Sequence, residues 1–359
     1  MNPTDFVSPR PTPISNFSPS LANQLMACQL RVAFQRDPSL RSWRRPSTYT
    51  ALGLAAHAVT EAAFRRKGWA SEAGAIRAQL QALWDKEVEQ SAASLVKAWA
   101  PAEPPPPPEW PGYALTRART IRRATRMLSK PLSERPQPSD GTGVEVELRD
   151  PASGLFGRAD RIEVDGDSTR VLDLKTGLNQ ADPTEDQQRQ LLLYSFLVHR
   201  KTGTWPRSIA IEDATGSQCV LPLHPSEAEE AVLEAQSAVS RFNDVVDADG
   251  FVELANPSPE LCRWCAFRVL CRPFWETLSS DWEQRAAMGS VTMTGNSQGG
   301  PFVVLRCESP ADRNTRTLQV SGLPERLPSG TTKVAIVDWS GSAEADSVRT
   351  RWSTIVRTC

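Results

Sequence analysis

Two aspartates and a lysine interrupt otherwise apolar runs between residues 154 and 177. Asp160 stands in GLFGRADRIEV, and both Asp173 and Lys175 stand in STRVLDLKTG. These two segments have the composition of β-strands, and the Asp-Gly-Asp turn between them predicts a hairpin. Charges inside a buried strand are costly unless something compensates them. A divalent metal ion would compensate the two carboxylates.

Metal-assisted hydrolysis is the chemistry that these three residues suit. Asp160 and Asp173 would hold Mg²⁺ or Mn²⁺, which are hard ions that prefer oxygen ligands. The ion would generate hydroxide and neutralise charge on a scissile phosphate. Lys175 follows Asp173 by two residues and so shares its strand face, from which it would orient the water and stabilise developing charge. The alternative is an ordinary surface hairpin with a salt bridge.

Two predicted helices carry further polar groups. The helix over residues 50–67 holds His57 one turn after Gly53, a residue that permits close approach of another backbone or a substrate. His57 is either a metal ligand or a core histidine. The helix over residues 186–200 places Gln190 and Tyr194 on one face. Their polar ends would meet a phosphate or base, or Tyr194 would simply lie at the edge of the core.

A basic stripe is predicted on the helix over residues 113–129. Its members fall at the spacing i, i+3, i+4, i+7 and are Arg119, Arg122, Arg123 and Arg126. The functional interpretation is contact with nucleic-acid phosphates. A solvated helix face is the alternative.

The chain has seven cysteines, and three of them lie within ten residues. Cys262, Cys265 and Cys271 form this group, and in a chain without a secretion signal such spacing favours metal or cluster ligation over disulfides. Cys28 lies on the buried side of a helix predicted through LANQLMACQLRVAFQR, where on its own it is typical of an inert core cysteine. We expect the remaining three to be unligated: Cys219, Cys307 and Cys359.

Overall charge and missing sequence signals argue against a strongly basic nucleic-acid-binding protein, a secreted or membrane protein and an ATP-driven motor. The 359 residues carry a formal net charge of −1, so any surface for nucleic acid must be a local patch. The N-terminus lacks the features of a signal peptide and no apolar run is long enough to span a membrane, so we expect a cytoplasmic protein. There is no GxxxxGK[ST] phosphate loop, so ATP-driven unwinding would need a partner.

Three regions are predicted. Residues 1–15 are proline-rich and extended, and residues 16–285 form an α/β domain that contains a stiff polyproline stretch at 101–111. From residue 288 to 359 five short strand candidates with turn residues between them predict a small all-β barrel of the OB or SH3 type. Such a barrel would bind nucleic acid or dock a partner.

The motifs occur in a characteristic order: GLAAH (53–57), GRAD (157–160), DLKTG (173–177) and QLLLY (190–194). This set resembles the RecB-type branch of the PD-(D/E)XK nuclease superfamily. Cys28 before the motifs, and Cys262-x₂-Cys265-x₅-Cys271 after them, are similar to the iron–sulfur cluster nucleases, among them the AddB nuclease domain and the CRISPR-associated RecB-like exonucleases. The resemblance covers roughly residues 15–275.

The resemblance implies a restriction-endonuclease-like core, with a mixed central sheet flanked by helices. It implies that His57, Asp160 and Asp173 bind the catalytic metal together with the Leu174 carbonyl, and that Lys175 is catalytic. Gln190 and Tyr194 would contact DNA or shape the site. The cluster cysteines would be the following: Cys28, Cys262, Cys265 and Cys271.

Four thiolates suit a 4Fe–4S cluster. By joining segments more than two hundred residues apart, the cluster would constrain the unfolded chain, so we expect a structural role. A four-cysteine zinc site is the alternative.

We therefore expect a metal-dependent deoxyribonuclease with exonuclease action on single-stranded or end-containing DNA, in DNA repair, recombination or phage defence, with a helicase or similar protein as partner. The alternatives are a non-catalytic DNA-binding or helicase-partner subunit and a cluster-based redox sensor.

Overall fold

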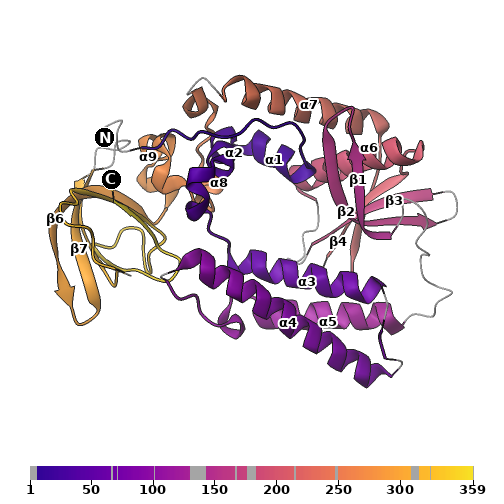
Figure 1. The fold of residues 1–359 in the computed structure, drawn as a ribbon, viewed down its shortest axis with the longest axis horizontal. Helices are drawn as coiled ribbons and strands as arrows, with labels where there is room; N and C mark the ends of the chain where they lie inside the picture. Colours follow the sequence, from indigo (N-terminus) through magenta and orange to yellow (C-terminus); the bar gives the residue numbers. More distant parts are fainter. Residues whose placement is uncertain are drawn as a thin grey trace.

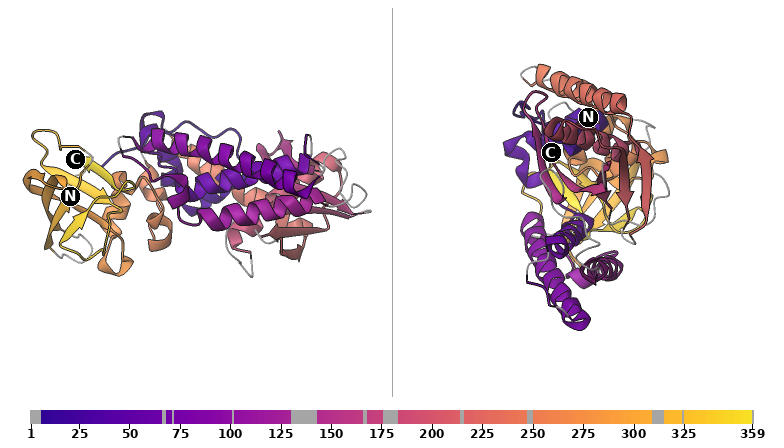
Figure 2. Two further views of the ribbon diagram at one scale, coloured as in Figure 1. Left: turned by 90° about the horizontal axis from the view of Figure 1, so that it is seen from below. Right: turned by 90° about the vertical axis from the view of Figure 1, so that its right-hand side faces the viewer.

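The computed structural model describes residues 6–65, 68–70, 72–100, 102–129, 143–165, 168–175, 183–213, 216–246, 250–308, 315–323 and 325–358. Two β-sheets lie at opposite ends of the molecule, with helices between and beside them (Figures 1 and 2). Within the described residues, no helix combines the length and apolar character needed to cross a membrane.

The first sheet has the strand order β1-β2-β3-β4-β5 and is mixed. Its strands are β1 (Gly143–Asp150), β2 (Leu155–Asp165), β3 (Ser168–Leu174), β4 (Ser208–Glu212) and β5 (Gln218–Pro222). Strands β3 and β4 run parallel, while the other neighbours are antiparallel. The predicted mixed α/β class and the predicted hairpin are confirmed, and the arrangement is consistent with a restriction-endonuclease-like core.

The helices surround this sheet. They are α1 (Pro19–Ala27), α2 (Gln29–Arg36), α3 (Thr48–Arg65), α4 (Ala73–Trp99), α5 (Tyr113–Ser129), α6 (Glu185–Thr202), α7 (Pro225–Asp244), α8 (Pro259–Arg263) and α9 (Arg272–Thr277). Short 3₁₀ segments are η2 (Pro38–Trp43), η3 (Pro107–Glu109), η5 (Gly250–Leu254), η6 (Arg268–Leu270) and η7 (Ser280–Trp282). Helices α3, α4 and α5 pack together along one side, and α6 lies against β1 to β4 with α1 and α7 beyond it (Figure 1).

Helix α6 shows how local sequence fixes an element that carries site residues. Thr184 and Gln187 form a capping box at its N-terminus, so two backbone N–H groups that lack helical partners are satisfied. Gly203 ends the helix with φ of 75°, a left-handed conformation that glycine adopts without strain. With both ends fixed, the face that carries Gln190 and Tyr194 is directed at the sheet.

The prediction of one continuous helix through Cys28 is wrong. Helix α1 ends at Ala27 and α2 begins at Gln29, because Cys28 has an extended backbone with φ of −165°. Its N–H still donates to the carbonyl of Gln24, while its own carbonyl accepts from Val32 as the next helix starts. The break removes Cys28 from the helix face and leaves it half-buried at a corner of the chain.

The second sheet has the order β10-β8-β7-β6-β9-β11. Its strands are β6 (Ala286–Ser297), β7 (Gly300–Glu308), β8 (Thr315–Ser321), β9 (Lys333–Val337), β10 (Ser347–Arg349) and β11 (Ile355–Thr358). The predicted β-rich C-terminal region is confirmed. Among the described strands β10 and β11 stand at opposite ends of the order, so the sheet is open in its pairing, and closure into a barrel stays a prediction.

The second sheet packs onto the α/β part with one face and has a separate hydrophobic cluster on its other face. Ala286, Met288 and Val337 of the second sheet belong to the same hydrophobic cluster as the α/β part. Arg268, in the cysteine-bearing segment, is only 3% exposed; it donates to Gln284 Oε1 at 2.9 Å and forms an ion pair with Asp338 of the C-terminal region. The C-terminal sheet is therefore packed directly onto the segment that carries three of the cysteines.

Candidate functional site

Two carboxylates face each other across β1 and β2. The pairs Val144–Arg161 and Val146–Ala159 flank Glu145 and place it opposite Asp160. Glu145 has φ of 54°, a left-handed conformation that is strained for a non-glycine residue and that clusters at functional sites.

The pairing of β2 with β1 continues in the same register on both sides of Asp160. The departure from regular backbone geometry therefore lies on β1, at Glu145.

Helix α3 brings His57 to these carboxylates. His57 Nδ1 lies 3.8 Å from Glu145 Oε1 and 3.9 Å from Asp160 Oδ1. One ligand atom from each of the three residues falls within 4.8 Å of the others. Because Mg²⁺ binds its ligands at about 2.1 Å in octahedral geometry, adjacent ligand atoms lie about 3 Å apart and opposite ones about 4 Å apart. An imidazole and two carboxylates at this spacing fit a hard divalent cation.

Asp173 and Lys175 lie beside this group and contact each other. Lys175 Nζ is 2.8 Å from Asp173 Oδ2, and Gln190 Nε2 of α6 donates to Asp173 Oδ1 at 3.4 Å. The backbone N–H of Leu174 donates to Asp160 Oδ2 at 2.7 Å, so the β3 backbone orients the other carboxylate. Thr176 and Gly177 of the same motif lie outside the described residues.

The site holds an excess of negative charge. Burial, followed by the charge of Asp173, raises the pKa of Asp160 to about 6. The pKa of His57 is raised as well, chiefly by Glu145, although burial opposes this and Asp160 adds to it. A divalent cation would relieve the same repulsion and displace these protons, so metal binding and protonation compete at these residues.

Gly157 explains the glycine of the GRAD motif. A Cβ atom at this position would lie 2.8 Å from Tyr194 Cε1 and 3.1 Å from Pro19 Cδ, both closer than van der Waals contact allows. Tyr194 is 7% exposed, and burial raises its pKa to about 12. The glycine therefore lets α6 approach β2, and Tyr194 packs beneath the site with its ring against the strand.

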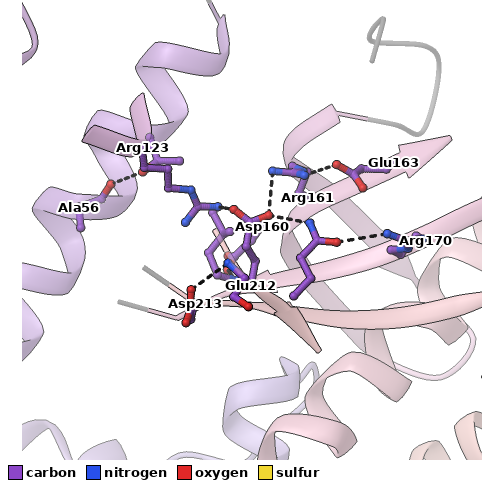
Figure 3. A network of polar contacts seen from close by, with 12 residues as sticks. Ala56, Arg123, Asp160, Arg161, Glu163, Arg170, Glu212 and Asp213 are labelled. Atoms are coloured by element: carbon purple, nitrogen blue, oxygen red, sulfur yellow. Dashed lines mark hydrogen bonds and ion pairs between the residues drawn. The ribbon is translucent and has the colours of Figure 1, made fainter. Parts of the chain in front are cut away.

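The four arginines of the predicted basic stripe are placed differently from one another. Arg122 and Arg126 are exposed, and Arg119 is half-buried. Arg123 turns inward: its side chain is 10% exposed and forms an ion pair with Glu212 of β4 (Figure 3). The structure thus separates Arg123 from the other three.

Four of the cysteines lie around one cavity. It is lined by Cys28, Cys262, Cys265 and Cys271. Burial raises the pKa of the Cys262 thiol to about 11 and also raises those of Cys265 and Cys271. Within the described chain no three of these sulfur atoms lie within 4.8 Å of one another. Cys219 and Cys307 are outside the cavity, and Cys359 lies outside the described residues.

The sequence alone did not single out Glu145. It stands in VEVEL, whose alternation predicts a strand but marks neither glutamate. The pairing register of β1 with β2, which places it opposite Asp160, is the signal that identifies it, and register cannot be read from a single strand. Glu145 joins His57 and Asp160 in one group, and the ligand role expected for Asp173 stays a prediction.

Comparison with known proteins shows to which family the chain belongs. No curated protein matches the chain. A solved structure described as "Crystal structure of SSO0001" is 16% identical, with coverage of 54% of this chain and 80% of that one and a TM-score of 0.27. The family model of the PD-(D/E)XK nuclease superfamily matches residues 16–272, which include all the residues of the site. The chain belongs to the PD-(D/E)XK nuclease superfamily.

Proposed function

We propose that the protein is a deoxyribonuclease that uses Mg²⁺ or Mn²⁺ to hydrolyse phosphodiester bonds, acting as an exonuclease on DNA ends or single strands. The observation that carries this proposal is the convergence of His57, Glu145 and Asp160 beside the ion pair of Asp173 and Lys175. In this assignment the first three residues hold the metal, with Asp173 and the Leu174 carbonyl as the further ligands that the family resemblance suggests.

Each residue of the site has a definite task in this reaction. The bound ion would supply Lewis acidity and an activated water. Lys175 is held by Asp173 at 2.8 Å, so its ammonium group is fixed beside the carboxylates, where it orients the attacking water and stabilises charge on the phosphate. Gln190 in turn restrains Asp173 from α6.

We also propose that the cavity lined by Cys28, Cys262, Cys265 and Cys271 holds a 4Fe–4S cluster. A tetrahedral zinc site with Zn–S bonds of about 2.3 Å needs sulfur atoms about 4 Å apart. The described cysteines share a cavity without such a close group of three, which favours a larger cofactor. Bound there, the cluster would join the α1–α2 corner to the segment at 262–271 and so stabilise the nuclease part.

Cleavage of end-labelled DNA tests the nuclease proposal. With Mn²⁺ the wild-type protein should degrade linear single strands and spare closed circles. Asp173→Ala and Lys175→Ala should abolish this activity, while Asp186→Ala, whose exposed side chain lies outside the site, should retain it. If both site variants cut as fast as wild type, the assignment is wrong; equal digestion of circles would refute the exonuclease assignment.

An iron and sulfide assay on protein purified without oxygen tests the cluster proposal. We expect about four of each per chain, because a cubane with four thiolate ligands holds four irons and four sulfides. A colourless protein that carries zinc instead would contradict it. Roles in repair, recombination or phage defence, and a helicase or similar partner, follow from the family resemblance and are part of the proposal.

A further inference from the structure

A buried carboxylate at the end of β4 collects groups from three other elements. Glu212 forms an ion pair with Arg123 of α5, and its Oε2 lies 3.4 Å from Arg161 Nη1 of β2. Gln218 of β5 donates to the same oxygen at 2.9 Å. Figure 3 shows Arg123 extending from its helix to Glu212, with Arg161 beside them. One residue therefore links a helix to three strands of the sheet.

This network is buried, which distinguishes it from a surface ion pair. The side chains of Arg123, Arg161 and Glu212 are 10%, 14% and 7% exposed. Burial lowers the pKa of Arg123, and Glu212 opposes that shift. Because a buried charge is costly without its partner, the helix is strongly favoured in the one position where Arg123 meets Glu212. Exposed pairs do not fix geometry in this way.

The helix that Arg123 anchors belongs to the group that carries His57. Helix α5 packs against α3 and α4, and α3 meets the first sheet at β1. Helix α3 attaches the helical group to β1, and the contact of Arg123 with Glu212 adds a second attachment at β4. The backbone carbonyl of Glu212 also accepts the N–H of Lys175 at 2.9 Å. Glu212 thus connects the His57 side of the site with the Lys175 side.

We propose that Arg123 and Glu212 form a clasp that positions helices α3 to α5 against the sheet and thereby sets the separation of His57 from Glu145 and Asp160. The proposal rests on the metal-binding part of the proposed function. Arg123 is then a positioning residue that acts through His57, whereas Arg122 on the same helix is exposed.

Binding of Mn²⁺ without DNA, followed by electron paramagnetic resonance, tests the clasp. Arg123→Met keeps the length of the side chain but removes its charge, and Arg123→Lys restores the charge. Arg122→Met changes the exposed neighbour on the same helix and is the matched control. We expect the Met variant at position 123 to raise the Kd for Mn²⁺ about tenfold or more at unchanged stoichiometry, as outer-shell changes do. The Lys variant should recover most of the affinity and the control should match wild type.

Three other results would overturn the clasp. Fewer binding sites per chain with an unchanged Kd would mean that Arg123→Met merely unfolds part of the protein. An unchanged Kd for Mn²⁺ together with a raised KM for DNA would mean that Arg123 contacts phosphate directly. An equal loss of Mn²⁺ affinity in the control would remove the special role of the buried pair. Wild-type protein that binds Mn²⁺ but cuts no DNA would refute the proposed nuclease and leave the clasp test intact.

Discussion

The replacement Asp160→Asn should make the metal-free protein more stable while abolishing its metal site. Burial, followed by the charge of Asp173, raises the pKa of Asp160 from 3.8 to about 6. At about 1.4 kcal/mol per pKa unit, a shift of about two units corresponds to about 3 kcal/mol. The neutral amide has the same shape and can still accept the N–H of Leu174. It therefore removes the charge while keeping the contact.

The sign of the effect depends on pH in a defined window. The folded state binds the proton of Asp160 more tightly than the unfolded state, so this group destabilises the fold as pH rises from about 4 to about 6. Above pH 6 the full difference is present, and below pH 4 both proteins carry a neutral side chain. The free energy of unfolding of Asp160→Asn should exceed that of wild type by about 3 kcal/mol at pH 8 and match it near pH 4.

Thermal unfolding in EDTA at pH 4 and pH 8 measures this difference. For a domain of this size about 2 °C of Tm corresponds to 1 kcal/mol, so the gain at pH 8 is about 6 °C. Addition of Mn²⁺ at a hundred times its Kd should stabilise wild type by about 3 kcal/mol and leave the variant unchanged. The difference in Tm between the two proteins at pH 8 should then disappear.

Asp150→Asn is the control of opposite sign. Although burial opposes the shift, hydrogen bonds from Ser153 and Arg200 hold the pKa of Asp150 below its ordinary value. This variant should be less stable than wild type at pH 8. If Asp160→Asn is equal to or less stable than wild type at pH 8 in EDTA, the account of Asp160 as a desolvated, repelled charge is refuted.

Two further predictions follow from the site. Glu145→Gln should weaken Mn²⁺ binding by at least tenfold, because it removes one of the two carboxylates that face His57; titration of metal-free protein measures it, and wild-type affinity would exclude Glu145 as a ligand. Gly157→Ala should destabilise the fold by about 1–3 kcal/mol in chemical denaturation, because the added Cβ meets Tyr194 Cε1 at 2.8 Å; an unchanged midpoint would show that α6 moves away without strain.

The sequence predicted those elements whose apolar residues repeat with a clear period. Helix α5 was expected at 113–129 and is found at Tyr113–Ser129, since its buried residues recur at helical spacing. The hairpin of β2 and β3 was predicted from strand composition and turn residues, and it does bring Asp160 next to the β3 backbone. The break at Cys28 was missed because nothing in the local sequence interrupts the helical pattern.

The missed parts of the site depend on contacts between distant segments. Glu145 becomes a candidate ligand only through its register against Asp160, and Arg123 leaves the exposed stripe only because Glu212 lies within its reach. Helical spacing places Arg123 near Arg119 and Arg126, but it cannot tell which member of a stripe borders a buried carboxylate. Periodicity describes one element at a time, whereas these assignments need two.

The charges around the first sheet are arranged in a consistent way. On the His57 side three carboxylates crowd together, and two of them have a cationic partner, because Arg158 pairs with Glu145 and Lys175 with Asp173. Asp160 faces only His57 at 3.9 Å among the described residues, and burial followed by the charge of Asp173 raises its pKa to about 6. At Glu212 the opposite holds, because two arginines and an amide satisfy one carboxylate. A metal ion could gain little from the second carboxylate and much from the first group. Asp160 is thus the least compensated carboxylate of this group, and its place beside His57 and Glu145 is where a divalent ion would relieve most repulsion.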